Sequence, residues 1–231
     1  MPDFKLATVI SHQILTAKVH DFVLETAEPL TYQPGQYISI QVAPKRLNAY
    51  SIAGKLGGYK IGLLVDTTPG GPGSIYFENL KAGDLIKFLG PFGNFTLRPD
   101  DGSDHVLILG TGCGISPLKA IIEGALQEAK LDKPITLYFG LRYPTDIFWD
   151  KYFNQLQVQY PNFKFKLCLS KPDQSWQGVS GHITDLVKQE HPQAQNYSAY
   201  ICGNNKMSQE AIEILKQAGC PPEKIYHEVF G

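Results

Sequence analysis

A glycine-rich turn, Gly110-Thr111-Gly112-Cys113-Gly114, follows an apolar run and precedes a helical pattern. Closely spaced glycines let backbone N–H groups approach a diphosphate, and a helix that starts there adds a partial positive charge. Such turns also form for packing alone, and that interpretation stays open. The spacing is G-x-G-x-G, and Gly140-Leu141-Arg142 stands where the common dinucleotide fingerprint has an acidic residue for the ribose. The turn therefore predicts a nucleotide site outside that common class.

Alternating strands and helices are expected to hold this turn. Apolar runs predict strands at 105–109, 135–140, 163–169, 198–202 and 226–230, and helical patterns fall at 117–130, 149–160, 183–190 and 208–218. This alternation predicts a C-terminal α/β domain with a doubly wound parallel sheet, whose ligands bind at the carboxyl ends of the strands. Cys202 ends one of these strands, although from the pattern alone a buried structural cysteine is the favoured interpretation.

The first hundred residues have a different pattern. Short segments rich in Val, Ile, Tyr and Phe occur at 5–14, 19–26, 36–42, 49–53, 59–65 and 84–89, with Gly and Pro clusters between them and one short helix at 74–80. They predict an N-terminal antiparallel β-barrel. A length of 231 residues suits two domains, which we divide as 1–100 and 101–231.

Composition excludes several classes of protein. The chain is 43% hydrophobic and 19% charged with a net charge of −1, which argues against disorder and against nucleic-acid binding. No apolar stretch reaches the length of a membrane helix, and no secretory signal is visible. The four cysteines, Cys113, Cys168, Cys202 and Cys220, lack metal-ligand spacing. We therefore expect a cytoplasmic protein with reduced thiols and no metal.

Motifs along both halves resemble those of the ferredoxin–NADP⁺ reductase superfamily, the two-domain flavin and nicotinamide reductases. The order and spacing of the motifs agree from end to end, which is more specific than any one of them. They are Pro34-Gly35-Gln36-Tyr37, Ala49-Tyr50-Ser51-Ile52, Gly70-Gly71-Pro72-Gly73-Ser74, Gly90-Pro91-Phe92-Gly93, Gly112-Cys113-Gly114-Ile115-Ser116-Pro117, Gly140-Leu141-Arg142, Cys202-Gly203-Asn204-Asn205-Lys206-Met207 and Glu228-Val229-Phe230.

The resemblance implies that the barrel binds FAD. Tyr50 would lie against the isoalloxazine ring, and Ser51 would offer its hydroxyl to flavin N5. Ile52, the next residue of the same strand, would also contact the cofactor. The diphosphate would be bound by Gly71, Gly73 and Ser74. The family's phosphate-neutralising arginine falls on Asn48, and Arg46 lies two residues earlier on the same face of an extended strand.

The resemblance also implies NAD(P)H in the second domain. Residues expected to bind the nucleotide are Gly112, Cys113, Gly114, Pro117, Arg142, Ser170, Lys171, Cys202, Gly203 and Met207. Cys202 would shape the nicotinamide pocket, Glu228 would assist proton balance near N5, and Phe230 would shield the flavin. The expected catalytic residues are Ser51, Cys202 and Glu228.

The segment after the third strand of this domain bears on the choice of nucleotide. Trp176-Gln177-Gly178 resembles NADH-using members, and Asp173 would repel a 2′-phosphate, whereas Lys171 could bind one. NADH is favoured and NADPH stays open.

The expected function is an NAD(P)H-dependent flavoprotein reductase. Two domains use all 231 residues, so we expect a separate acceptor such as ferredoxin, flavodoxin or an oxygenase component. Two alternatives remain: a flavin reductase whose flavin diffuses freely, which Asn48 favours, and a non-catalytic electron-transfer or nucleotide-sensing subunit. The sequence predicts no oligomeric state.

Overall fold

The computed structural model describes residues 3–229, which form two compact units. The first unit takes the chain up to Leu97 together with Lys119–Gly124. The second takes Arg98–Leu118 and the chain from Ala125 onward.

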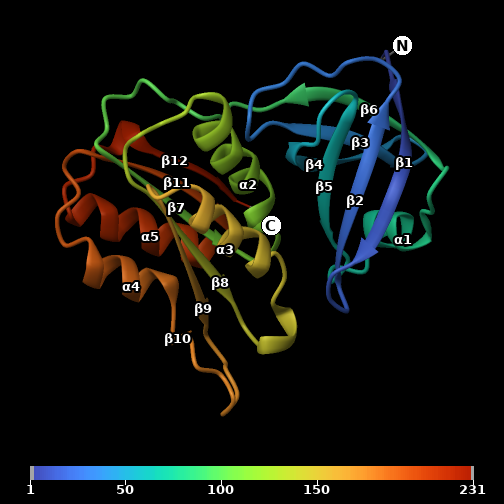
Figure 1. Cartoon of the computed structure of the whole chain (residues 1–231). Coiled ribbons are helices and arrows are strands. Elements are labelled where there is room, and N and C mark those ends of the chain that lie inside the picture. Colours follow the sequence, from blue (N-terminus) through green and yellow to red (C-terminus); the bar gives the residue numbers. More distant parts are fainter. Residues whose placement is uncertain (1–2, 230–231) are drawn as a thin grey trace. The chain divides into compact units, whose positions relative to one another are not determined.

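The first unit is a closed antiparallel barrel with strand order β1-β2-β5-β4-β3-β6 (Figure 1). Its strands are β1 (Lys5–Ile14), β2 (Val19–Thr26), β3 (Tyr37–Ala43), β4 (Arg46–Lys55), β5 (Lys60–Asp66) and β6 (Leu85–Phe92), and one helix, α1 (Pro72–Asn79), joins β5 to β6. β1 pairs with both β2 and β6, which closes the barrel and removes the open sheet edges.

Alternating side chains fill the barrel, as period-two strands require. In β2, Phe22 and Leu24 are fully buried, and Ile38 and Ile40 alternate in the same way along β3. Phe77 of α1 meets Phe22 edge to face at 5.1 Å between ring centroids. The helix is therefore fixed to the barrel by its own apolar side chain.

The second unit is a parallel sheet with strand order β10-β9-β8-β7-β11-β12. Its strands are β7 (His105–Thr111), β8 (Ile135–Leu141), β9 (Phe163–Leu169), β10 (Val179–Ser180), β11 (Tyr197–Gly203) and β12 (Ile225–Val229). Its helices are α2 (Ile115–Glu123), α3 (Asp150–Gln159), α4 (Ile183–Glu190) and α5 (Asn205–Gln217), of which α2 contributes its last five residues to the first unit.

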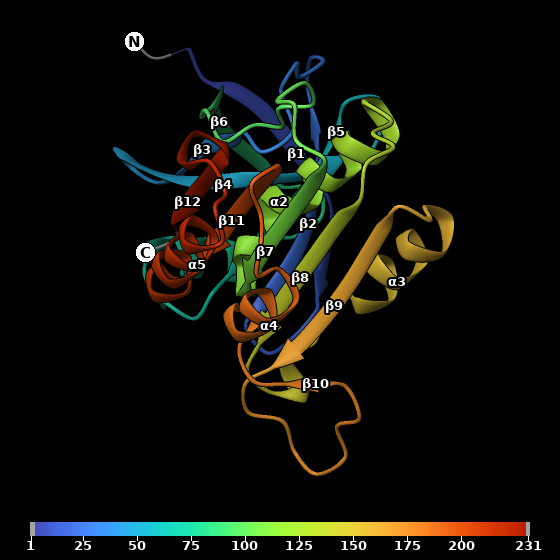
Figure 2. The same ribbon diagram turned by 90° about the vertical axis from the view of Figure 1, so that its left-hand side faces the viewer.

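Helices α4 and α5 cover one face of the sheet and α3 lies on the other (Figure 2). Apolar side chains of α4 and α5, including Val187, Ala211 and Leu215, pack on Leu107, Leu109 and other residues of β7 and β11 to form one core. The strand order reverses beside β7, so the carboxyl ends of β7 and β11 flank the switch point where such sheets bind ligands.

The predicted fold class, a barrel followed by a doubly wound parallel sheet, is confirmed. One predicted helix differs in detail: the segment expected as a helix at 117–130 is α2 followed by a π-helical turn at Gly124–Glu128. A Cβ on Gly124 would lie 2.6 Å from Cγ of Pro34, so this turn is packed against the barrel's own chain. The strand β10 is two residues long and carries no periodic signal, which is why the sequence did not reveal it.

Within residues 3–229, we find no helix with the length and apolar character needed to cross a membrane. The last residue of the strand expected at 226–230, Phe230, lies outside the described residues.

Candidate functional site

Three side chains expected to contact flavin follow one another on one face of β4. Arg46 Nε lies 3.5 Å from Asn48 Oδ1, and Asn48 Nδ2 lies 3.5 Å from the Tyr50 hydroxyl. Residues two apart on a strand share a face, so the sequence fixes this row. Burial raises the pKa of Tyr50, against smaller opposing effects of the Asn48 hydrogen bond and the Arg46 charge. The Tyr50 hydroxyl therefore stays protonated, and it accepts the hydrogen bond from the Asn48 amide.

The glycine segment before α1 approaches this row closely. A Cβ on Gly73 would lie 2.5 Å from both Asn48 Nδ2 and the Tyr50 hydroxyl, so a larger residue would displace both side chains. At Gly71, the N-cap of α1, a Cβ would meet nothing within 4 Å. Ser74 is buried at the start of the helix, and the first turn carries no acidic residue. Open backbone, a helix N-terminus and an amide donor together suit a diphosphate.

The strand edge beside Tyr50 is also suited to a planar ligand. β4 pairs with β3 from Arg46 to Ser51, but its ladder to β5 covers only Ile52 and Lys55. The residues of β4 that precede Ile52 are therefore outside the β4–β5 ladder. Ser51 is 6% exposed and Ile52 is fully buried in the barrel core, whereas Tyr50 packs its ring against Phe77 at 4.6 Å between centroids. The residues expected to hold FAD thus fit that cofactor by shape and donor chemistry.

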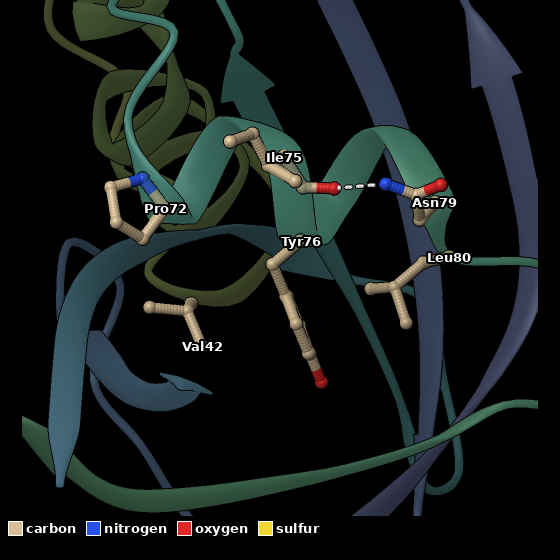
Figure 3. Close-up of a pocket in the computed structure, with 6 residues that line it drawn as sticks. All are labelled: Val42, Pro72, Ile75, Tyr76, Asn79 and Leu80. Carbon is tan, nitrogen blue, oxygen red and sulfur yellow. Dashed lines mark hydrogen bonds between the residues drawn. The ribbon is translucent and has the colours of Figure 1, made fainter. Parts of the chain in front are cut away.

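A pocket of about 460 Å³ lies beside the same helix. Figure 3 shows Tyr76 descending from α1 between Val42 and Leu80, with Pro72 at the helix start. The Asn79 amide donates to the Ile75 carbonyl at 2.7 Å and so closes the helix end of the pocket. The lining is mostly apolar and begins at the segment expected to bind the diphosphate.

In the second unit, the glycine turn packs on the end of β11. A Cβ on Gly114 would lie 2.4 Å from the Cys202 carbonyl oxygen and 2.7 Å from Cα of Gly203, so only glycine fits there. Gly112 has φ +54° and a Cβ on it would meet nothing within 4 Å, which leaves its backbone open. The turn therefore brings Gly112 and Cys113 to the carboxyl end of the sheet, with Pro117 buried in the first turns of α2.

Thr111 and Asn204 join the ends of β7 and β11. The Asn204 backbone N–H donates to the Thr111 hydroxyl at 3.3 Å, and the Asn204 carbonyl oxygen Oδ1 accepts from the Met207 N–H at 2.9 Å. Asn204 is therefore the N-cap of α5 through its side chain. The sequence analysis did not identify this cap, although asparagine before a helix is a recognised N-cap signal.

Cys202 and Glu228 are neighbours across β11 and β12. Burial raises the pKa of Cys202, with a smaller contribution from Glu228, so the thiol stays protonated and is a poor nucleophile. Burial alone raises the pKa of Glu228, whose buried Oε2 has no hydrogen-bond partner among the described residues. A partly desolvated carboxyl with an unsatisfied oxygen is suited to exchanging a proton with a ligand.

The ends of β8 and β9 bring the remaining nucleotide residues together. Ser170 N–H donates to the Leu141 carbonyl at 3.0 Å and Lys171 N–H to the Arg142 carbonyl at 2.8 Å, so the two chains run side by side beyond the strands. Lys171 Nζ stands 5.9 Å from the Tyr143 ring centroid. This end of the sheet therefore holds two exposed cations, Arg142 and Lys171.

The following segment is shaped by two local contacts. The Asp173 carboxylate accepts from the Ser175 hydroxyl at 2.6 Å and from its N–H at 2.9 Å, and these bonds lower the pKa of Asp173. The Trp176 indole N–H donates to the Val179 carbonyl at 3.0 Å, and a Cβ on Gly178 would lie 2.3 Å from the indole ring. The Trp-x-Gly pattern thus folds the indole over the glycine.

The structure therefore brings the expected flavin residues together in the first unit and the expected nucleotide residues together along one sheet edge of the second. Phe230 lies outside the described residues. Within residues 3–229, no group of three or more His, Cys, Asp or Glu side chains is arranged to hold a metal ion.

Two family models match the chain, one in each half. Residues 6–97 match an oxidoreductase FAD-binding domain, and residues 108–213 match an oxidoreductase NAD-binding domain. These matches agree with the barrel and the sheet described above.

Relatives match over nearly the whole chain. A Ralstonia reductase component, the ferredoxin–NAD(P)⁺ component of naphthalene 1,2-dioxygenase and salicylate 5-hydroxylase systems, is 30% identical over 96% of this chain and 68% of its own length. The reductase subunit of an Amycolatopsis aromatic O-demethylase is 32% identical over 97% of this chain and 68% of its own length.

Solved structures of other proteins superpose on nearly the whole of this chain. The Amycolatopsis cytochrome P450 reductase GcoB superposes with a TM-score of 0.90 at 29% identity, covering 98% of this chain and 69% of that one. A ferredoxin–NADP⁺ reductase from Neisseria gonorrhoeae with bound FAD and NADP superposes with a TM-score of 0.86 at 20% identity, covering 99% of both chains, which shows the shared fold.

The fold and the two family matches together define the class of this protein, a two-domain oxidoreductase that binds flavin and nicotinamide. The chain belongs to the ferredoxin–NADP⁺ reductase superfamily. It is accordingly an NAD(P)H-dependent flavoprotein oxidoreductase with FAD and NAD(P)H as its cofactors.

Proposed function

We propose that this protein is the reductase of an oxygenase-type electron-transfer system: it takes electrons from NAD(P)H through FAD and delivers them to a separate ferredoxin-like protein acceptor. Relatives described as reductase components of such systems support this acceptor class. The observation that carries the proposal is the packing of Gly114 against the Cys202 carbonyl, which sets an open glycine turn at the end of β11, the strand in which Cys202 pairs with Glu228 of β12.

Bound FAD would supply the reactivity, which is to accept a hydride from NAD(P)H and to pass its two electrons on to the acceptor. The chain's own residues bind and orient. Gly112 and Cys113 would present backbone N–H groups to the nucleotide diphosphate, and Gly203 with Met207 would border the nicotinamide. Cys202 would shape the nicotinamide pocket without reacting, because its buried thiol stays protonated. Glu228 would hold or release a proton at its carboxyl.

In the first unit, Tyr50 and Ser51 would hold the isoalloxazine at the edge of β4. Gly71, Gly73 and Ser74 would bind the diphosphate with Asn48, and Arg46 would add positive charge through its contact with Asn48. We propose that the adenosine half of FAD uses the pocket between Val42 and Tyr76, since that pocket begins at Pro72, directly after Gly71. Tyr76→Ala is then expected to weaken binding of FAD while leaving the binding of FMN, which lacks adenosine, unchanged in a fluorescence titration.

NADH is the proposed electron donor. Asp173 is fixed in its turn by Ser175 and keeps its negative charge there, which opposes a 2′-phosphate. Arg142 and Lys171 favour a phosphate and are the reason to test NADPH beside NADH. Steady-state kinetics with both nucleotides and a dye acceptor would decide: a higher kcat/KM with NADPH would overturn this choice.

A gel-filtration experiment tests the bound cofactor. Protein that stays yellow through the column and oxidises NADH with an added ferredoxin supports the proposal. Colourless protein that oxidises NADH only with added flavin would support the flavin reductase that Asn48 favours. Failure to oxidise either nucleotide with any flavin or dye would support a non-catalytic subunit. The proposed location is the cytoplasm, where the four thiols would stay reduced.

A further inference from the structure

An exposed aromatic ring stands beyond the carboxyl end of β8. Tyr143 is 43% exposed, and it comes three residues after Gly140, which pairs with Thr111 at the end of β7. The glycine turn at Gly112–Gly114 follows Thr111 directly. The ring therefore lies at the same edge of the parallel sheet as the glycine turn, which is the edge where such sheets bind ligands.

The backbone that carries this ring is fixed by reciprocal hydrogen bonds. The Tyr143 N–H donates to Asp146 Oδ2 at 3.0 Å, and the Tyr143 carbonyl accepts from the Asp146 N–H at 3.0 Å. Pro144 begins the short 3₁₀ turn that these bonds enclose. Beside it, the Lys171 N–H donates to the Arg142 carbonyl at 2.8 Å. The backbone is thus ordered before any ligand arrives, so little of its freedom remains to be lost on binding.

The Lys171 ammonium covers the ring and is held there by the ring alone. Its Nζ stands 5.9 Å from the Tyr143 ring centroid, within the range of a cation–π contact. In the part of the chain that the structure describes, this ammonium makes no ion pair and donates no hydrogen bond. Because cation–π contacts at exposed sites are weak, a planar ligand can displace the ammonium from the ring at small cost.

We propose that Tyr143 is the surface on which the adenine of the nicotinamide nucleotide stacks, and that Lys171 covers this surface until the nucleotide binds. This inference rests on the proposed function, because it takes the nucleotide to bind along this sheet edge. Adenine is flat and has a π-face that suits a tyrosine ring. The displaced ammonium is then free to pair with a phosphate of the ligand. NADH and NADPH would both use the ring, since both contain adenine.

Isothermal titration calorimetry with the full chain tests this stacking without relying on catalysis. The probes are NAD⁺ and ADP-ribose, which both contain adenine. Tyr143→Ala is expected to weaken the binding of both probes roughly tenfold, a loss typical for the removal of one base-stacking aromatic ring. Tyr143→Phe keeps the ring and is expected to bind both probes as the wild type does. The matched control is Tyr59→Ala, which removes a barrel tyrosine that is 48% exposed and is expected to change neither affinity.

Steady-state kinetics with a dye acceptor give a second readout. Tyr143→Ala is expected to raise KM for NADH by a similar factor and to leave kcat unchanged, because the ring would contact adenine and not the reacting nicotinamide. Reduced nicotinamide mononucleotide is the comparison donor, since it lacks the adenosine half. Its kcat/KM is expected to be the same in Tyr143→Ala and in the wild type.

A loss confined to the adenine-containing ligands, with full binding in Tyr143→Phe, would support the proposal. Unchanged binding of ADP-ribose by Tyr143→Ala would overturn it. An equal loss of kcat/KM with reduced nicotinamide mononucleotide would also overturn it, because that donor has no adenine to stack. A wild-type protein that binds neither NAD⁺ nor ADP-ribose would instead count against the proposed function.

Discussion

At the residue scale, the four cysteines differ sharply in surroundings. Cys113 is partly exposed in the nucleotide turn, whereas Cys168, Cys202 and Cys220 are buried. Burial raises the pKa of Cys168 and of Cys220 to about 11 in each case, and it raises the pKa of Cys202 as well. Since the thiolate is the nucleophile, the buried thiols should react slowly.

We therefore predict that iodoacetamide alkylates Cys113 of the native protein before the other three cysteines, and that NAD⁺ slows this alkylation. Mass spectrometry of tryptic peptides over time measures the order. Cys113→Ala should remove the fast phase. Equally fast labelling of Cys202 would show that its strand end is not closed as described.

Gly73 and Gly71 give a second prediction at this scale. Gly73→Ala would push a methyl group into Asn48 and Tyr50, whereas Gly71→Ala meets nothing within 4 Å. Gly73→Ala is expected to destabilise the flavin-free protein by about 1–3 kcal/mol, the usual cost of overpacking, and Gly71→Ala by much less. Urea unfolding without flavin measures both, and equal destabilisation would contradict the close approach of α1 to β4.

At the element scale, a pair of partly buried imidazoles, His105 and His191, lies where β7 begins and α4 ends. The His105 and His191 rings meet edge to face at 5.3 Å between centroids, and His105 Nε2 lies 2.9 Å from the Thr136 hydroxyl. Burial, with His191 and Lys164 as smaller contributors, lowers the pKa of His105 to about 4. Burial lowers the pKa of His191 as well.

Acidification should therefore destabilise the second unit. Both imidazoles are held neutral in the fold, while the unfolded chain takes up protons near pH 6.5. The His105 contribution to stability is thus fully present above that pH and is lost as the pH falls toward 4, by at most about 1.4 kcal/mol per pH unit, and the lowered pKa of His191 acts in the same direction. His105→Gln, which keeps a polar group beside Thr136, should flatten this dependence in urea unfolding between pH 7 and 5; an unchanged slope would contradict it.

The same scale shows what the sequence could predict. Alternating burial made strands such as β2 and β3 predictable from the sequence, because each of these two sorts its side chains between the core and the other face. The order β1-β2-β5-β4-β3-β6 was not readable, since it depends on pairings between distant segments. Likewise, Gly124, where α2 changes to the π turn, lies close to Pro34, and no local pattern contains a contact between residues 90 positions apart.

The candidate site, too, could be predicted from the sequence only in part. Motif spacing located Gly73, Gly114 and Cys202, because glycine and strand ends leave a trace in the sequence. Spacing could not show that the Asn204 side chain caps α5 while its backbone N–H donates to Thr111. Nor could spacing show that Lys119 donates a hydrogen bond to the Ala53 carbonyl. Those contacts join residues whose types are ordinary and whose partners are set only by the fold.

At the scale of the whole molecule, the chain combines a barrel that fits FAD with a sheet edge that fits a nicotinamide nucleotide. The central claim is that electrons pass from one cofactor to the other and leave for a separate acceptor. The function therefore depends on both units at once, and a test on either cofactor alone would not reach it.

Anaerobic mixing of the FAD-loaded protein with a stoichiometric amount of NADH, followed by visible absorbance, tests this claim most directly. We predict that the flavin absorbance bleaches with one equivalent of NADH and returns when two equivalents of an oxidised one-electron ferredoxin are added. Bound flavin that keeps its full absorbance with both NADH and NADPH would contradict it.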